Sequence, residues 1–133
     1  MNINEYQDFV ESLTSQESNH YEAFIKKLDE LDKDTNVNLP LLLNSAAGLS
    51  AESGEFMEIP KKVFWQGKPL DEATIFHMKR ELGDILFYWM NACRALNLKP
   101  QDVIDENHNK LTNRYKDGKF NVEHSENRKP GDL

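Results

Sequence analysis

Two pairs of carboxylates carry the chemistry that this sequence suggests. Glu52 and Glu55 are three residues apart, and so are Glu81 and Asp84. Residues three apart on an α-helix lie on one face, so two helices that face each other would bring four carboxylates together. Such a cluster repels itself in a partly dry site unless a divalent cation neutralises it, and all-oxygen ligands favour Mg²⁺ or Mn²⁺. The sequence predicts a metal-dependent enzyme that acts on a phosphorylated substrate.

The surroundings of these acids are stronger evidence for a metal site than their spacing is. With 23 acidic residues among 133, about four pairs three residues apart arise by chance. Glu81 and Asp84, however, lie among Leu82, Ile85 and Leu86. A helix packed nearly all round offers an acid little solvent, and buried acids usually have partners. The apolar setting therefore favours metal ligation over a merely solvated face.

Helices are expected to position these carboxylates, beginning with two in the N-terminal part of the chain. Apolar residues recur at helical spacing over residues 3–13, after a cap at Asn2 or Asn4. A second amphipathic helix follows from Asn19 to about residue 31. The polar segments between elements, residues 14–18 and 32–38, are expected to be loops.

The carboxylate pairs fall on the third and fourth expected helices. The third starts near Pro40, since proline suits the first helical turn, and Pro60 is expected to kink or end it soon after Glu58. The fourth helix, capped by Asp71, covers about residues 71–97. Its segment 85–90 is apolar on every side, so this helix is expected to be the central and most buried one.

A fifth helix is expected from Pro100 to about Lys116, and residues 117–133 are expected to be an irregular tail. No segment has the period of a strand or of a solenoid repeat. The fold class is therefore all-α, a bundle of four to five helices. A chain of 133 residues fits a single domain, with its core over about residues 39–116.

Composition limits the partners and the compartment. The formal net charge of −7 argues against a nucleic acid polymer, which needs clustered Lys and Arg. The single cysteine, Cys93, cannot form an internal disulfide, which suits a reducing cytoplasm, or the host cytoplasm for a viral protein. The first residues lack the pattern of a signal peptide. No segment approaches the roughly eighteen apolar residues of a membrane span, so a soluble protein is expected.

Three short motifs occur in order within residues 39–128: Gly48-Leu-Ser-Ala-Glu52-Ser-Gly-Glu55, then Glu81-Leu-Gly-Asp84, then Asn107-His-Asn-Lys110 running on to Arg114, Tyr115 and Phe120. Together they resemble the MazG-like all-α nucleoside triphosphate pyrophosphohydrolases. The resemblance implies hydrolysis of a nucleoside triphosphate between its α and β phosphates, to the monophosphate and pyrophosphate. It also implies Mg²⁺ ligated by Glu52, Glu55, Glu81 and Asp84, and substrate-side roles for Asn107, Lys110, Tyr115 and, more weakly, Arg114.

The resemblance further implies dimers or tetramers with sites built between helices. The residues point the same way, because segments 41–49 and 82–96 are apolar nearly all round and need more cover than amphipathic neighbours give. A homodimer or homotetramer is therefore expected. The chain also departs from the family pattern: Ala51 stands where many relatives have a further acid, which bears on the number of metals, and residues 1–38 carry little of the family's signal.

Further residues are candidates for binding the substrate. Lys61 and Lys62, with Lys110 and Arg114, would supply positive charge for the triphosphate. Tyr88, one turn beyond Asp84, would close against a deoxyribose, and Trp65 would stack on a base. His77 shares the helical stripe of Glu81 and is expected to be packed or hydrogen-bonded rather than a ligand. Either Glu52 or Glu55 would accept the proton of the attacking water.

Two other functions compete with this interpretation. A ferritin-like di-iron site needs a Glu-x-x-His unit on each of two helices, and the chain offers only Glu17 with His20, in a polar segment. A non-catalytic helical dimerisation module stays open because of Ala51. Retention of all four acids argues against such a module, and Mg²⁺ binding would separate the two.

Overall fold

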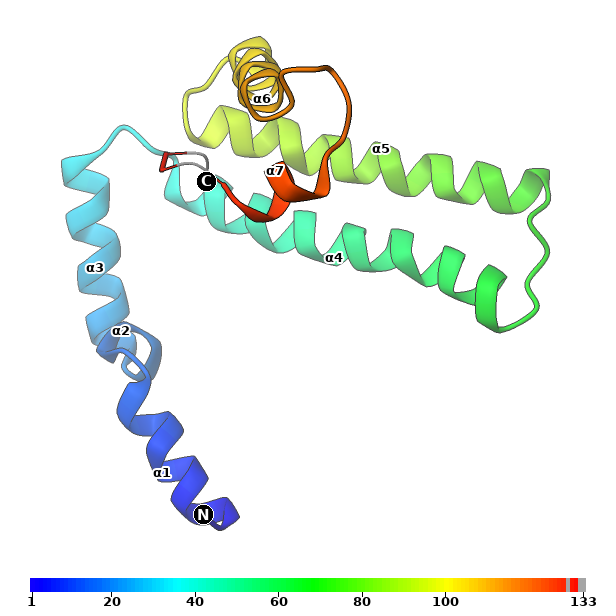
Figure 1. The fold of residues 1–133 in the computed structure, drawn as a ribbon. Helices are drawn as coiled ribbons and strands as arrows, with labels where there is room; N and C mark the ends of the chain where they lie inside the picture. Colours follow the sequence, from blue (N-terminus) through cyan, green and yellow to red (C-terminus); the bar gives the residue numbers. More distant parts are fainter. Residues whose placement is uncertain (129, 132–133) are drawn as a thin grey trace.

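The computed structural model describes residues 1–128 and 130–131, so residues 129, 132 and 133 of the C-terminal tail lie outside the described part. Seven helices and no strand are present in the described residues (Figure 1), which confirms the all-α class. The helices are α1 (Ile3–Leu13), α2 (Gln16–Asn19), α3 (Tyr21–Asp34), α4 (Leu39–Trp65), α5 (Glu72–Ala95), α6 (Pro100–Arg114) and α7 (Val122–Glu126).

The long helices α4 and α5 form an antiparallel hairpin, the centre of the fold (Figure 1). Side-chain caps fix where each helix begins. The Asn38 side chain accepts the N–H of Leu41 at 3.0 Å, and the Asp71 side chain accepts the N–H of Thr74 at 2.9 Å. These caps satisfy backbone donors that have no partner within the helix, and they confirm the predicted start of both elements.

The two helices come closest where a glycine removes a side chain from the interface. A Cβ on Gly48 of α4 would overlap the ring of Tyr88 of α5. Glycine costs roughly 1 kcal/mol relative to alanine inside a helix, so its place in α4 is explained by the space that the tyrosine ring needs. This contact fixes the register of α4 against α5 on one side of the carboxylates.

Of the two outcomes expected at Pro60, a kink or an end of the helix, the end soon after Glu58 is wrong. The helix continues through Pro60 to Trp65. A proline inside a helix removes one hydrogen bond, here to the carbonyl of Phe56, and costs about 3 kcal/mol or more. Packing against α5 offsets this cost, since Ile59, the residue just before the proline, is only 3% exposed.

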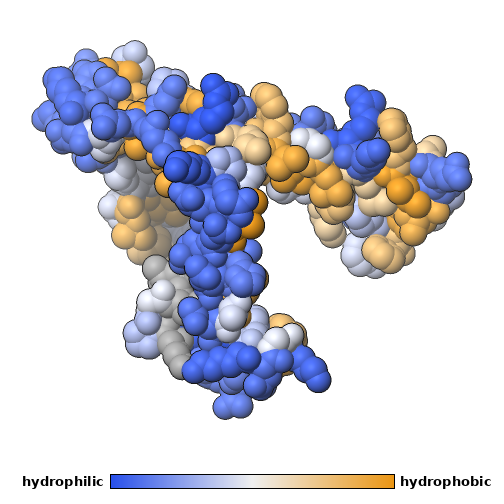
Figure 2. Space-filling model, turned by 90° about the horizontal axis from the view of Figure 1, so that it is seen from above, coloured by the Kyte–Doolittle hydropathy of each residue, from blue (hydrophilic) through white to orange (hydrophobic). Residues whose placement is uncertain are grey.

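The expectation that α5 is the most buried helix is confirmed within the described residues, because five of its residues are buried, against three of α4 and none of the other helices. Its apolar segment is nevertheless not covered all round, since Leu82, Leu86 and Phe87 are more than half exposed. Figure 2 views the hairpin from its α5 side and shows hydrophobic side chains out to its free end at the right. A helix that is apolar on every side thus has surface that needs to be covered. The described residues of one chain do not cover it.

Helices α1 to α3 form an arm that leaves the hairpin and points away from it (Figure 1). Two hydrogen bonds hold the joint between arm and hairpin. The N–H of Asn38 donates to the carbonyl of Ala95 at 2.9 Å, and the side-chain amide of Asn97 donates to the carbonyl of Asn36 at 2.5 Å. Asn97 itself has a positive φ of 56°, which ends α5.

Smaller differences concern polar segments. The helical turn α2 occupies most of the segment expected to be a loop at 14–18, capped by Ser15, and α3 runs on to Asp34. The tail is not irregular throughout, because Asn121 caps the short helix α7. Local side-chain caps of this kind act over three residues and leave no apolar periodicity to read. Across the described residues, no helix combines the length and apolar character that crossing a bilayer requires.

Candidate functional site

Three of the four predicted metal ligands lie together in the hairpin. Glu52 and Glu55 from α4 and Glu81 from α5 each offer a carboxylate oxygen, and these oxygens all lie within 4.8 Å of one another. Glu81 is buried, Glu52 is half-buried and Glu55 is exposed. Asp84 is exposed and is not part of that group, although its charge acts on Glu52. The site thus has a buried carboxylate at its base and an accessible one at its mouth.

Electrostatics within the cluster is unfavourable for the ionised acids. Desolvation raises the pKa of Glu52 above its ordinary value of 4.5, and the negative charges of Glu55, Asp84 and Glu81 raise it further, in that order. Carboxylates that repel one another in this way are stabilised in their charged form by a divalent cation. Oxygen ligands at this separation suit a hard cation such as Mg²⁺, so the residues present fit a metal site.

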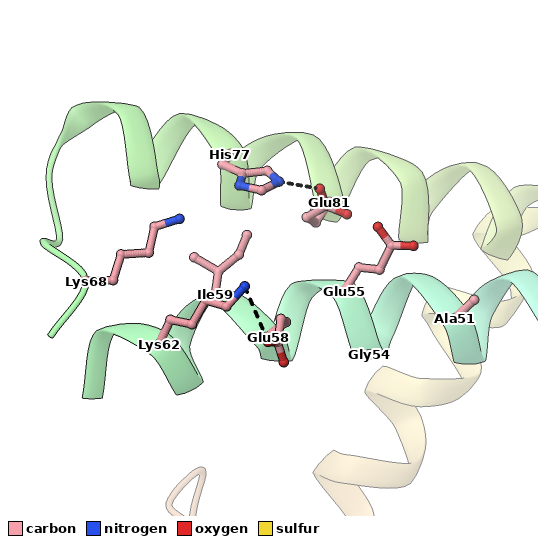
Figure 3. A pocket seen from close by; sticks show the side chains of 9 residues that line it. All are labelled: Ala51, Gly54, Glu55, Glu58, Ile59, Lys62, Lys68, His77 and Glu81. Carbon is pink, nitrogen blue, oxygen red and sulfur yellow. Dashed lines mark ion pairs between the residues drawn. The ribbon is translucent and has the colours of Figure 1, made fainter. Parts of the chain in front are cut away.

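His77 lies one helical turn before Glu81 and holds that carboxylate. Its Nε2 is 3.0 Å from Oε1 of Glu81 (Figure 3). The imidazole is about half exposed, whereas the Glu81 side chain is 10% exposed. The interaction agrees with the expectation of a hydrogen-bonded histidine. It limits the rotation of Glu81 and so keeps the buried carboxylate directed at the cluster.

A cavity of about 360 Å³ opens beside the carboxylates, between α4 and α5. Figure 3 shows Glu55 from α4 and His77 and Glu81 from α5 pointing into the space between the two helices. The cavity changes character along its length, from acidic side chains at one end to basic ones at the other. Its lining consists of Ala51, Gly54, Glu55, Glu58, Ile59, Lys62, Lys68, His77 and Glu81.

Two of the predicted phosphate-binding lysines share one carboxylate. Lys61 forms an ion pair with Glu58, and Nζ of Lys62 lies 3.4 Å from Oε1 of Glu58. The hydrogen bond from Lys61, followed by that from Lys62, lowers the pKa of Glu58. Of the two lysines, Lys62 lines the cavity and Lys61 does not. The structure therefore distinguishes Lys62, at the cavity, from Lys61, outside it, which the sequence alone does not.

Lys68 is a site residue that reasoning from the sequence missed. Gly67, with φ of 71°, reverses the chain after α4, and the N–H of Lys68 then donates to the carbonyl of Lys62 at 3.1 Å. This turn brings the Lys68 side chain to the basic end of the cavity. The signal available was a lysine directly after a glycine, in the short connection between the two acid-bearing helices.

The other predicted substrate-side residues lie away from this cavity. Trp65 is 70% exposed at the end of α4, with its ring 6.0 Å from that of Phe64. Tyr88 packs over Gly48, seven residues along α5 from Glu81. Seven residues of helix span roughly 10 Å, so Tyr88 lies at the opposite side of the carboxylates from the lysines.

Helix α6 carries the remaining predicted residues. Asn107 and Lys110 line a cavity of about 570 Å³ with Trp89 of α5. Lys110 and Arg114 also line a neighbouring one of about 460 Å³. Tyr115 caps α6, and its ring lies 5.7 Å from that of Phe120. Among the described residues, α6 thus places its polar groups beside the Tyr88–Trp89 end of α5 rather than in the carboxylate cavity.

Comparison with known proteins gives one result. No curated protein and no solved structure matches the chain. A family model described as the MazG nucleotide pyrophosphohydrolase domain matches residues 42–119. That span contains the carboxylate cluster, the cavity lysines and all of α6, and it covers more than half of the chain. The chain therefore belongs to the MazG nucleotide pyrophosphohydrolase family.

Proposed function

We propose that this protein is a Mg²⁺-dependent pyrophosphohydrolase that cleaves a nucleoside triphosphate, or its deoxy form, between the α and β phosphates. The observation that carries the proposal is the carboxylate cluster of Glu52, Glu55 and Glu81, which lies beside a cavity with lysines at its far end. Acidic and basic groups in one cavity suit a substrate that is a polyanion bound together with a cation.

The cluster would hold one or more Mg²⁺ ions, with Mn²⁺ as a substitute. Glu52, Glu55 and Glu81 supply the close set of oxygens, and Asp84 lies near enough to influence Glu52. When bound, the cation neutralises phosphate oxygens and lowers the pKa of a water molecule. His77 supports this arrangement by holding the Glu81 carboxylate from outside the cluster.

Glu55 is the better candidate of the two for accepting the proton of the attacking water. It is exposed and lines the cavity, whereas Glu52 is half-buried and does not line it. A general base must reach the water that it deprotonates. We therefore assign Glu52 to hold the cation only, and Glu55 to take the proton in addition to its place in the cluster.

Lys62 and Lys68 would bind the phosphate oxygens at the basic end of the cavity, with Glu58 limiting the rotation of Lys62. The nucleoside would then extend past the carboxylates toward Tyr88, which lies beyond them on α5. Asn107, Lys110 and Arg114 on α6, and Tyr115 at its C-terminal cap, remain proposed for the nucleoside side. This direction places the α–β bond, between the two ends, over the carboxylates.

Assembly and location belong to the same proposal. Broad apolar surface on α5 supports a homodimer or homotetramer. Cys93 is a free, buried thiol, which supports a reducing compartment such as the cytoplasm.

Release of pyrophosphate from a panel of ribo- and deoxyribonucleoside triphosphates tests the proposal. Activity should require Mg²⁺, vanish with EDTA and fall at least 100-fold in Glu81→Gln, which keeps the shape of the side chain and removes its charge. Glu72→Gln is the matched control, since Glu72 lies in the first turn of the same helix, outside the cluster. It should leave the rate within twofold.

An inactive protein would leave the non-catalytic dimerisation module as the alternative, and calorimetry with Mg²⁺ would then decide. Binding that is lost in Glu81→Gln would indicate an enzyme whose substrate lies outside the panel. The absence of binding would indicate that the site has lost its metal and its catalytic function. The di-iron alternative has little support, because Glu17 lies in α2 on the arm, away from the hairpin (Figure 1).

A further inference from the structure

The arm carries an apolar stripe that the described residues of the chain leave largely uncovered. Along α1 the stripe consists of Ile3, Tyr6, Phe9, Val10 and Leu13, which are 77%, 52%, 48%, 44% and 71% exposed. No residue of α1 is buried. Isolated helices shorter than about 12–15 residues are marginal in water, and α1 has 11 residues. A helix of this length and composition requires a surface to pack against.

A second uncovered stripe runs along α5, on the side turned away from the carboxylates; we call it the outer face. It consists of Ile75, Phe76, Leu82, Leu86, Phe87 and Met90, each 41–59% exposed. These positions fall on one half of the helical wheel, and Glu81 and Asp84 fall on the other. Hydrophobic side chains of this limb are visible from above in Figure 2. The outer face is thus free when the cavity is occupied.

Charge makes the two stripes complementary. Residues 1–34 contain nine Asp and Glu residues against three Lys, so the arm holds six of the seven net negative charges of the chain. The outer face instead includes two bases, Lys79 and Arg80, between its apolar residues. An acidic amphipathic helix and an apolar face that carries bases are complementary both in hydrophobicity and in charge.

The joint directs the arm away from its own hairpin. Hydrogen bonds from Asn38 to Ala95 and from Asn97 to Asn36 fix the chain where it enters α4, and from there α3 and α1 point outward (Figure 1). We propose that α1 of each copy packs along the outer face of α5 of a second copy, so that two chains exchange arms. Reciprocal exchange covers both stripes and closes into a two-fold dimer.

The apolar area is sufficient for a stable dimer. A fully covered aromatic side chain buries roughly 150–250 Å², so side chains that are about half exposed would each lose on the order of 100 Å². One arm on one outer face would remove on the order of 1,000 Å² from water, and the reciprocal pair about twice that. Stable interfaces bury about 1,200–2,000 Å². The inference specifies the interface of the proposed oligomer and does not depend on its hydrolase activity.

Cross-linking between two different chains tests the exchange. In a Cys93→Ala background, the full chain carrying Phe9→Cys is mixed with the full chain carrying Leu86→Cys and treated with a short bismaleimide. The mixture should give a covalent heterodimer. Asn4→Cys in place of Phe9→Cys is the matched control, because Asn4 lies on the polar side of α1, and it should give at least tenfold less product.

Two results would overturn the proposal. One is a dimer in solution that gives no cross-link between Phe9→Cys and Leu86→Cys. The other is a cross-link only within a single chain that carries both substitutions, which would mean that the arm folds onto its own hairpin. Sedimentation provides a second measurement: Phe9→Asp should weaken dimerisation at least 100-fold and Asn4→Asp less than threefold. Pyrophosphate release is measured separately, so the proposed interface and the proposed activity can be refuted independently.

Discussion

Replacement of Gly48 by alanine tests the close packing of α4 on α5. The added Cβ would overlap the Tyr88 ring, so the ring or the helices must shift. Overpacking costs about 1–3 kcal/mol, and alanine returns about 1 kcal/mol through its higher helix propensity. Because the overlap is severe, we expect the upper part of this range, a net loss of about 1–2 kcal/mol in the free energy of unfolding.

Gly54→Ala is the matched control, because the same substitution in the same helix meets no atom within 4 Å. It should gain about 1 kcal/mol, so the two variants should differ by about 2–3 kcal/mol. Urea unfolding of the metal-free protein, followed by circular dichroism, measures both. Equal stabilisation by the two substitutions would refute the packing argument. Tyr88→Leu should remove most of the Gly48→Ala penalty, since the smaller side chain leaves room for the Cβ.

Three further predictions concern the site. Lys68→Ala should raise the KM for the triphosphate at least tenfold, whereas Lys61→Ala, outside the cavity, should change it less than threefold; steady-state kinetics measures both. Glu55→Gln should lower kcat at least 100-fold but weaken Mg²⁺ binding, measured by calorimetry, far less than Glu81→Gln does. The raised pKa of Glu52 means that the folded protein binds this proton more tightly than the unfolded chain. Its contribution therefore destabilises the metal-free protein as the pH rises from the ordinary value of 4.5 through the higher folded pKa. Thermal melts should show that Glu52→Gln removes this part of the pH dependence.

Much of the fold follows from local signals. The spacing of Ile3, Tyr6 and Phe9 predicts α1, and the Asp71 cap predicts the start of α5, because both signals act within one or two helical turns. The extension of α4 through Pro60 could not be predicted, since it depends on contacts with α5 that offset a local cost. The direction of the arm depends on the bond from Asn97 to Asn36, which joins residues 61 positions apart.

In the candidate site, too, local signals can be predicted from the sequence and contacts that depend on the fold cannot. Spacing of three along each helix predicts which acids share a face, and the hairpin brings Glu52, Glu55 and Glu81 together. Lys68 lies in a connection, where periodicity carries no information and the turn at Gly67 decides the direction of the side chain. Membership of the family agrees with the resemblance carried by the motifs.

The central claim is that the carboxylate cluster directs hydrolysis to the bond between the α and β phosphates. Phosphorus NMR of a deoxynucleoside triphosphate incubated with the protein and Mg²⁺ tests it most directly. We predict equimolar monophosphate and pyrophosphate from the native protein and turnover at least 100-fold slower by Glu81→Gln. Release of orthophosphate, or turnover by Glu81→Gln at the native rate, would contradict the account.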